Sequence, residues 1–222
     1  MKSAKNGRVD KSYIMDLKIE NKIILIGGSP TVGKSYVARK LAEDLKLPWI
    51  STDTVREQMR KIVRKEDYPA LFFHSGATSD MAVEFLTHKS AEDIVRHQNG
   101  ESLEVWKGVK ALIETDYVWQ SFIIEGVAIL PQQVHEIMLI NKKVKSLFLI
   151  DENKERVRDI IFTRGLWDDA DKYPDSVKEK EVEWVFAFND WIKDEAGKYN
   201  LPVINIGTRE KLFEEVKSIL DI

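Results

Sequence analysis

The octapeptide Gly28–Ser35, GSPTVGKS, constrains this chain more than any other feature. It matches the pattern G-x-x-x-x-G-K-[ST] at every fixed position, after the apolar run Ile23–Ile26 and before apolar residues at helical spacing. A loop between a strand and a helix can aim successive backbone N–H groups, and the helix N-terminus, at phosphate oxygens. The octapeptide therefore predicts a phosphate-binding loop in an α/β protein. The alternative is a glycine turn that only begins a helix, with Lys34 on the surface.

In a loop of this kind Lys34 reaches the β- and γ-phosphates of a nucleotide, and the Ser35 hydroxyl ligates Mg²⁺. We therefore expect ATP and Mg²⁺ as cofactors, because magnesium prefers oxygen ligands and is commonly bound together with phosphates. The residues expected to contact the nucleotide are the loop, the residue after it and one arginine of a later helix: Gly28, Ser29, Pro30, Thr31, Val32, Gly33, Lys34, Ser35, Tyr36 and Arg158.

Strand and helix patterns alternate along the rest of the chain. Short β-branched runs predict strands at 23–28, 49–50, 122–124, 144–150 and 203–206. Apolar residues at helical spacing predict helices at 34–46, 54–65, 131–140, 152–164, 178–198 and 209–220, and a helical insertion at 81–115. A capping box of Thr54 and Glu57 is expected to open the second helix, and Pro69 to end it.

This alternation, with the phosphate-binding loop after the first strand, predicts a three-layer α/β P-loop fold, with a five-stranded parallel sheet for which we expect the order 2-3-1-4-5. Ligands of such sheets bind beyond the carboxyl ends of the strands. We expect a tail or arm at 1–21 and one P-loop domain at 22–222. Within that domain, 66–120 is expected to form a helical acceptor region and 164–178 a short lid.

Composition narrows the class of protein. With 43% hydrophobic and 32% charged residues the chain is typical of a globular protein, and its net charge of −3 provides no general field for nucleic acid or membranes. Cysteine is absent, which excludes disulfides and thiolate metal sites. No apolar run is long enough to span a bilayer, and the polar N-terminus lacks a signal peptide pattern. We expect a cytoplasmic protein with a small-molecule partner, and the sequence leaves its oligomeric state open.

The GTP-switch signatures are not in their usual places. Asp194–Gly197 spells D-x-x-G, but it lies in a predicted helix far from any strand end. The chain is also short for a motor or a ring ATPase. A small-molecule kinase is the class that remains, with a non-catalytic ATP-sensing module as the alternative from another class.

Four segments carry a resemblance to a known family. They are GGSPTVGKS at 27–35, ISTDTVREQMR at 50–60, FIIEGVAILP at 122–131 and TRG at 163–165. In this order they resemble the nucleoside-monophosphate-kinase-like group and, within it, the 2-phosphoglycerate kinase family. The resemblance implies phosphoryl transfer from ATP to 2-phosphoglycerate or a similar phosphorylated hydroxy-acid. A nucleoside or nucleotide acceptor, or the sugar nucleotide of toxin-like kinases, stays open as an alternative.

Acceptor residues are expected after the second strand. Asp53 follows that strand, where a carboxylate can orient the acceptor hydroxyl or take its proton. The simpler interpretation is helix capping by Thr52, Asp53 or Thr54. Arginine forks bind carboxylates and phosphates, so Arg56 and Arg60 are candidate acceptor ligands, whereas Arg64 is expected to be a surface charge.

The end of the third strand supplies two further candidates. Glu125 is expected to hold a magnesium-bound water or the acceptor, and Gly126 to let the substrate approach the backbone. Helix capping is the simpler role for Glu125. Together with Ser35, Glu125 makes up the expected metal site.

A lid arginine completes the expected site. Arg164 ends a predicted helix before the polar stretch Gly165–Asp169, and a lid cation there stabilises charge on the transferring phosphoryl group. The stretch is acidic and has no second arginine, unlike the usual kinase lid. Lys34, Asp53 and Arg164 are the expected catalytic residues. Arg156 is either a nucleotide contact or a surface charge, and His74 is more simply a loop or core histidine than a substrate ligand.

Overall fold

The computed structural model describes residues 22–73, 75–76, 78–115, 120–166 and 170–222. The expected tail at 1–21, His74 and three lid residues, 167–169, lie outside these ranges. Helices and strands alternate along the described chain: β1 Ile23–Gly28, α1 Lys34–Leu45, β2 Trp49–Ser51, α2 Thr52–Ile62, η2 Pro69–Phe72, α3 Ser79–His88, α4 Ala91–Glu114, β3 Phe122–Glu125, α5 Pro131–Ile140, β4 Val144–Ile150, α6 Lys154–Thr163, α7 Asp175–Lys198, β5 Val203–Asn205 and α8 Arg209–Leu220.

The five strands form one parallel sheet in the order β2-β3-β1-β4-β5, which confirms the predicted topology. Its central strands are β-branched and buried on both faces, as parallel sheets require. In the register, Glu125 at the end of β3 lies beside Ile26 of β1 and Ser51 of β2. The segments that follow β1, β2 and β3 therefore meet at one edge of the sheet.

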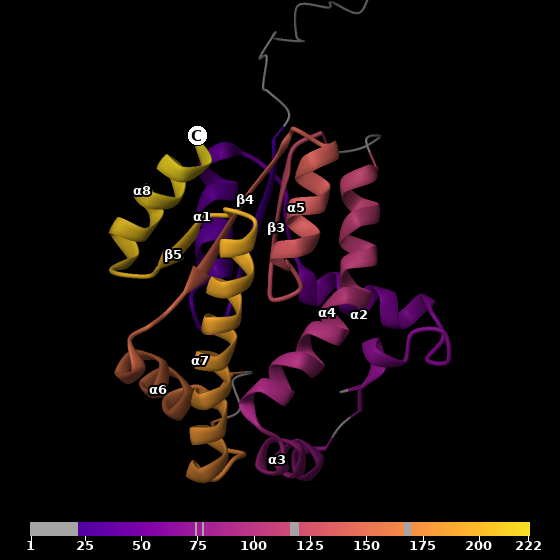
Figure 1. Cartoon of the computed structure of the whole chain (residues 1–222), viewed down its shortest axis with the longest axis vertical. Coiled ribbons are helices and arrows are strands. Elements are labelled where there is room, and N and C mark those ends of the chain that lie inside the picture. Colours follow the sequence, from indigo (N-terminus) through magenta and orange to yellow (C-terminus); the bar gives the residue numbers. More distant parts are fainter. Residues whose placement is uncertain (1–21, 74, 77, 116–119, 167–169) are drawn as a thin grey trace, which may run out of the picture.

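Helices cover both faces of the sheet and give three layers (Figure 1). Ile24 and Ile26 of β1 pack with α1 and α8 on one face. Ile23 and Leu25 point the other way, into the larger core with α2, α4, α5 and α7. A third, small cluster joins α6 to α7 through Val157, Ile161, Val182 and Val185.

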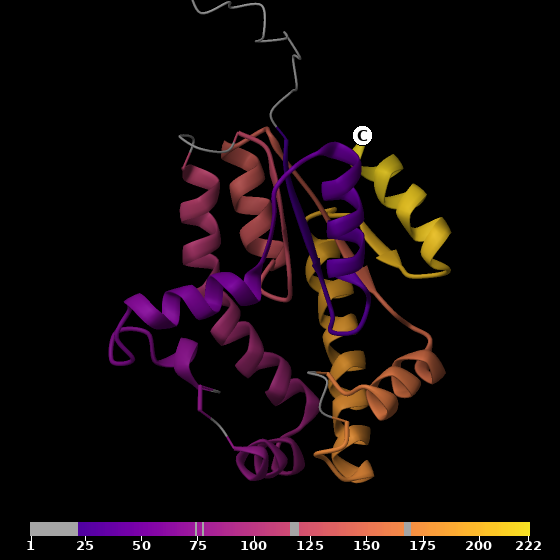
Figure 2. The ribbon, with the colours of Figure 1, turned by 180° about the vertical axis from the view of Figure 1, so that it is seen from behind.

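Two groups of helices extend beyond the carboxyl ends of the strands (Figures 1 and 2). One consists of α2, η2, α3 and the first half of α4, and the other of α6 with the N-terminal half of α7. The loop after β1 lies between them. The helical insertion predicted at 81–115 is thus present between β2 and β3, as α3 and α4. Among the described residues, no helix combines the length and apolarity needed to cross a bilayer.

The beginning of α2 differs from the prediction. Ser51, not Thr54, caps this helix: its side chain accepts a hydrogen bond from the Thr54 amide at 3.1 Å. The capping box of Thr54 and Glu57 is wrong, because α2 already begins at Thr52 and Glu57 lies within it. The capping alternative for Asp53 falls with it, so the Asp53 carboxylate is available for other contacts.

The end of α2 is also earlier than predicted. The helix stops at Ile62 because Val63 is extended, with φ −100° and ψ 159°, and Pro69 begins η2 instead of ending α2. Arg64 therefore does not continue the helix face of Arg56 and Arg60. It is exposed and pairs with Asp67 at 2.8 Å, as expected of a surface charge.

Candidate active site

The loop Gly28–Ser35 is shaped by close packing at its start and by left-handed backbone farther on. A Cβ on Gly28 would lie 2.3 Å from the carbonyl oxygen of Leu149, so only glycine lets β1 end against β4. Thr31 and Gly33 have φ of 69° and 84°. Within the part of the chain that the structure describes, none of the amides of Thr31–Ser35 donates a hydrogen bond. Five consecutive free amides at a helix N-terminus suit an anion.

Ser29 has a different part in this loop. Its amide donates to the Leu149 carbonyl at 3.3 Å, and its buried hydroxyl donates to Asn189 Oδ1 at 2.6 Å. Asn189 Nδ2 in turn donates to the Asp151 carbonyl at 2.7 Å. Ser29 thus anchors the loop to β4 and α7, and the amides that remain free begin at Thr31.

Lys34 lies in the loop's interior. Its Nζ donates to the Ser29 carbonyl at 2.6 Å, and the residue is 8% exposed. Burial lowers the pKa of Lys34, against the opposing effect of the carboxylates of Glu125 and Asp53. A buried cation beside free amides adds to the attraction for a phosphate chain.

Glu125 faces this lysine from the end of β3. It is 3% exposed, and Ser35 Oγ donates to its Oε1 at 3.0 Å. Burial raises the pKa of Glu125, although Lys34 and the Ser35 hydroxyl favour the charged form. The two predicted metal ligands are therefore adjacent, as oxygens that fit Mg²⁺. Among the described residues no group of three or more His, Asp or Glu could hold a metal, so such an ion would need phosphate and water oxygens as well.

Gly126 is required for a reason that the sequence did not predict. With φ of 148°, a Cβ there would lie 1.8 Å from Thr52 Oγ1. The space beside Gly126 is filled by Thr52 at the start of α2. The glycine therefore brings β3 and α2 together, which places Asp53 next to Glu125 and Lys34.

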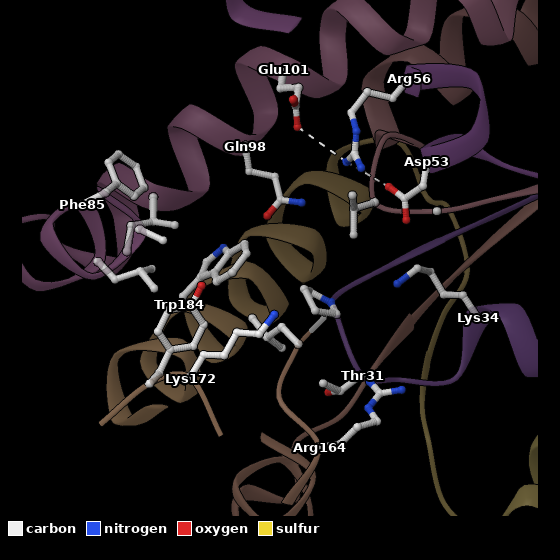
Figure 3. Close-up of a pocket in the computed structure, with 18 of the residues that line it drawn as sticks. Thr31, Lys34, Asp53, Arg56, Phe85, Gln98, Glu101, Arg164, Lys172 and Trp184 are labelled. Carbon is white, nitrogen blue, oxygen red and sulfur yellow. Dashed lines mark ion pairs between the residues drawn. The ribbon is translucent and has the colours of Figure 1, made fainter. Parts of the chain in front are cut away.

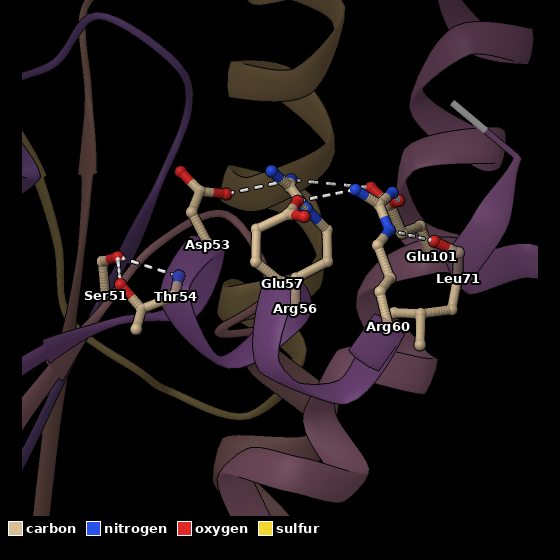
Figure 4. Close-up of polar contacts among 8 residues, drawn as sticks. All are labelled: Ser51, Asp53, Thr54, Arg56, Glu57, Arg60, Leu71 and Glu101. Carbon is tan, nitrogen blue, oxygen red and sulfur yellow. Dashed lines mark hydrogen bonds and ion pairs between the residues drawn. The ribbon is translucent and has the colours of Figure 1, made fainter. Parts of the chain in front are cut away.

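Arg56 and Arg60 share carboxylates but differ in how fully they are bound (Figure 4). Arg60 is 11% exposed, and its three nitrogens donate to the Leu71 carbonyl, Glu57 and Glu101 at 2.7, 2.7 and 2.6 Å. Arg56 is 23% exposed, and its contacts with Asp53, Glu57 and Glu101 are 3.0, 3.2 and 3.8 Å long. Arg60 is thus fixed between α2, η2 and α4, whereas Arg56 is held more loosely.

One cavity of about 610 Å³ brings most of the predicted residues together (Figure 3). On one side is the loop wall, made of Pro30, Thr31, Lys34 and Ser35. Opposite is the helical wall, which consists of residues of α2, α3 and α4: Asp53, Arg56, Arg60, Ser79, Ala82, Phe85, Leu86, Ile94, Gln98 and Glu101. Glu125, Gly126, Arg164 and Lys172 also line the cavity.

The cavity is positively charged although the chain as a whole has a net charge of −3. Its charged lining consists of five cations and three carboxylates: Lys34, Arg56, Arg60, Arg164, Lys172, Asp53, Glu101 and Glu125. This local excess of positive charge favours anionic ligands.

Two predicted nucleotide contacts do not line the cavity: Arg158 pairs with Glu179 at 2.6 Å, and Tyr36 packs against the core of α1 and α8. Arg156 pairs with the buried Asp151 at 2.6 Å.

Among the lining residues that were not singled out for the site from the sequence are Gln98, Glu101, Lys172 and Trp184. Gln98 and Glu101 interrupt the buried stripe of Ile94, Val105 and Val109 on α4, which is a signal that the sequence does contain. Lys172 adds a second cation to the lid region, where a second arginine is missing. Trp184 has both roles, since it belongs to the core and borders the cavity.

Two archaeal proteins named 2-phosphoglycerate kinase are similar to this chain. The one from Methanocaldococcus jannaschii is 30% identical over 203 residues, which are 90% of this chain and 62% of that protein. The one from Methanothermobacter thermautotrophicus is 30% identical over 226 residues, 95% of this chain and 71% of that protein. The chain belongs to the 2-phosphoglycerate kinase family. It spans less than the full length of these family members, and no family model matches it.

A solved structure agrees with the fold of this 2-phosphoglycerate kinase family member. A gluconokinase from Sinorhizobium meliloti aligns with a TM-score of 0.51 and 14% identity, over 90% of this chain and 92% of the gluconokinase. At this identity the likeness supports the three-layer α/β kinase fold alone.

Proposed function

We propose that this chain transfers the γ-phosphoryl group of ATP to the hydroxyl of a small anionic hydroxy-acid, and that 2-phosphoglycerate is this acceptor. The observation that carries the proposal is the shared cavity, in which free loop amides and Lys34 face Asp53 and Arg56. The names of the relatives supply the acceptor. The positive lining of the cavity suits both an ATP phosphate chain and an acid.

The proposed residues have separate tasks in this transfer. The acceptor hydroxyl oxygen attacks the γ-phosphorus, the bond to the β–γ bridging oxygen breaks, and ADP leaves. Asp53 takes the hydroxyl proton, and Arg56 holds an anionic group of the acceptor. Lys34 and Arg164 stabilise charge on the transferring group from two sides. Mg²⁺ at the oxygens of Ser35 and Glu125 would neutralise part of the phosphate charge.

Arg60 and Glu101 belong to the support of this arrangement. Each of the three guanidinium nitrogens of Arg60 already donates a hydrogen bond, to the Leu71 carbonyl, Glu57 and Glu101. Glu101 accepts from Arg60 and lies 3.8 Å from Arg56. We therefore assign Arg56 to the acceptor and Arg60 to the scaffold.

A nucleotide acceptor is the second candidate, because part of the helical wall is apolar. Ala82, Phe85, Leu86 and Ile94 line that part, together with Trp184. An aromatic, apolar surface suits a planar base better than a three-carbon acid.

An acceptor panel separates these functions. The chain is supplied with Mg-ATP and, in turn, with 2-phosphoglycerate, 3-phosphoglycerate, glycerate, nucleosides and nucleoside monophosphates, and ADP release is measured. We expect the largest stimulation with 2-phosphoglycerate. Stimulation by a nucleoside or nucleotide alone would favour the second candidate. ATP binding by calorimetry without ADP release for any acceptor would contradict kinase activity.

A further inference from the structure

Gln98 on α4 has an amide group that the protein itself does not use. Its Oε1 is enclosed, and it accepts no hydrogen bond from the residues that the structure describes. Gln98 lies on the helical wall, three residues before Glu101. Figure 3 shows its amide reaching into the cavity between the Arg56–Glu101 pair and Trp184, with the nitrogen turned toward the side of Arg56.

The surroundings of this amide leave a ligand as its natural partner. Phe85, Leu86 and Ile94 of the same wall of the cavity have no polar side-chain group. Each nitrogen of Arg60 already donates one hydrogen bond to the protein, so Arg56, with its longer contacts, is the more available cation beside the amide. The enclosed atom is the oxygen, which is an acceptor and would meet a donor; the nitrogen, turned toward the side of Arg56, is the group that can donate to an anionic ligand.

Arg56 determines which ligand group the amide meets. Arg56 is the loosely held cation of the helical wall, and an anion bound there places its oxygens beside the Gln98 nitrogen. An amide N–H can donate to a carboxylate or phosphate oxygen, whereas a carboxylate in its place would repel the same oxygen.

We propose that Gln98 is a specificity-determining residue, whose amide nitrogen donates to an anionic oxygen of the acceptor bound at Arg56. The proposal rests on the proposed function, since it concerns the acceptor of the same site. The hydrogen bond from Gln98 makes the chain prefer acids over neutral acceptors of similar size. It also gives a role to one of the two polar residues that interrupt the buried stripe of α4.

Asn99 provides a matched control on the same helix. Its Oδ1 is also enclosed and also without a partner among the described residues, but Asn99 does not line the cavity. A general effect of changing an enclosed amide on α4 should therefore appear at both positions. An effect on the acceptor should appear at Gln98 alone.

The experiment compares Gln98→Glu, Gln98→Met and Asn99→Asp with the unchanged chain at pH 8. For each, KM and kcat are measured with 2-phosphoglycerate and with ATP, together with the melting temperature. We expect Gln98→Glu to raise the acceptor KM by about 100-fold and Gln98→Met by about 10-fold, with the KM for ATP within about twofold. Asn99→Asp should change neither KM.

Several results would overturn the role of Gln98. An acceptor KM within about twofold after both Gln98 substitutions would do so, and so would equal shifts for Gln98→Glu and Asn99→Asp. A larger effect of Gln98→Met than of Gln98→Glu would mean that the amide packs instead of donating to an anion.

Direct binding separates this proposal from the proposed function. 2-Phosphoglycerate is titrated calorimetrically into the unchanged chain and into Gln98→Glu, without turnover. If the acid binds, the Gln98 variant binds it more weakly, and no ADP forms, the kinase activity fails while the role of Gln98 stands. If the acid does not bind the unchanged chain, both fail.

Discussion

The two walls of the cavity are built in different ways. The loop wall belongs to one stretch of eight consecutive residues, Gly28–Ser35, and its binding groups are mainly backbone amides set by the turn itself. The helical wall depends on side chains that meet only in the folded chain, such as Arg60 and Glu101, which are 41 residues apart. A short local pattern therefore suffices to specify the donor end, whereas the acceptor end follows from how α2, α3 and α4 pack.

Lys34→Ala tests the loop wall and should have the largest effect. We expect kcat/KM to fall by about 1,000-fold or more, because Lys34 is a buried cation of the loop itself and lines the cavity. The melting temperature should change little, because burial already lowers the pKa of Lys34 and makes its charge unfavourable in the folded state. Steady-state ADP release and thermal unfolding measure the two quantities.

Lys40→Ala is the matched control for this loss. Lys40 lies on the same helix, but its Nζ is 4.2 Å from the centre of the Phe213 ring, and it does not line the cavity. Its replacement should leave kcat/KM unchanged. Retention of more than about a tenth of the activity by Lys34→Ala would remove the basis for the loop's role in catalysis.

The sequence predicted one wall well and the other poorly, for physical reasons. Strand runs such as Ile23–Ile26 and the spacing of the glycine loop are local, so the sheet order and the loop followed from them. The boundaries of α2 were wrong because Ser51, rather than Thr54, supplies the cap. The contacts of Glu101 and the place of Gln98 in the cavity depend on α4 crossing α2, which no local pattern encodes.

Within the helical wall, Arg56 and Arg60 are expected to differ in how much each contributes to the stability of the folded chain. Arg60→Met should lower the free energy of unfolding by about 3 kcal/mol, because it removes the 2.6 Å ion pair of Glu101 and the donor to the Leu71 carbonyl in a mostly buried place. Arg56→Met should cost less than about 1 kcal/mol, since its pairs are longer and more exposed. Urea unfolding of both variants gives these values.

The effects of the two substitutions on the acceptor KM should have the opposite order, with Arg56→Met larger than Arg60→Met. Arg56→Met is expected to raise the acceptor KM by about 10- to 100-fold and to leave the KM for ATP unchanged. Arg60→Met, assayed well below its melting temperature, should change the acceptor KM less. If Arg60→Met has the larger effect on acceptor KM and Arg56→Met the larger effect on stability, the assignment of the two arginines is reversed.

The smallest expected effect concerns two buried carboxyls, Glu125 beside the loop wall and Glu101 in the helical wall. Burial raises the pKa of both above the ordinary value of 4.5, despite nearby cations. In the window above pH 4.5 the folded chain therefore holds more protons than the unfolded chain. The stability that this provides is complete below pH 4.5 and is lost as the pH rises through the raised pKa values.

The pKa of Glu57 is shifted in the opposite direction, so its effect on the pH dependence of stability is also opposite. Its pKa is lowered, because hydrogen bonds and charges of Arg56 and Arg60 outweigh desolvation, so its contribution is lost as the pH falls below 4.5. Urea unfolding from pH 3.5 to 8 should thus show a flatter loss of stability above pH 4.5 in Glu125→Gln and Glu101→Gln. Glu57→Gln should change the dependence only below pH 4.5. If the free energy of unfolding depends on pH above 4.5 in the same way in Glu125→Gln, Glu101→Gln and the unchanged chain, burial does not raise the pKa of either carboxyl.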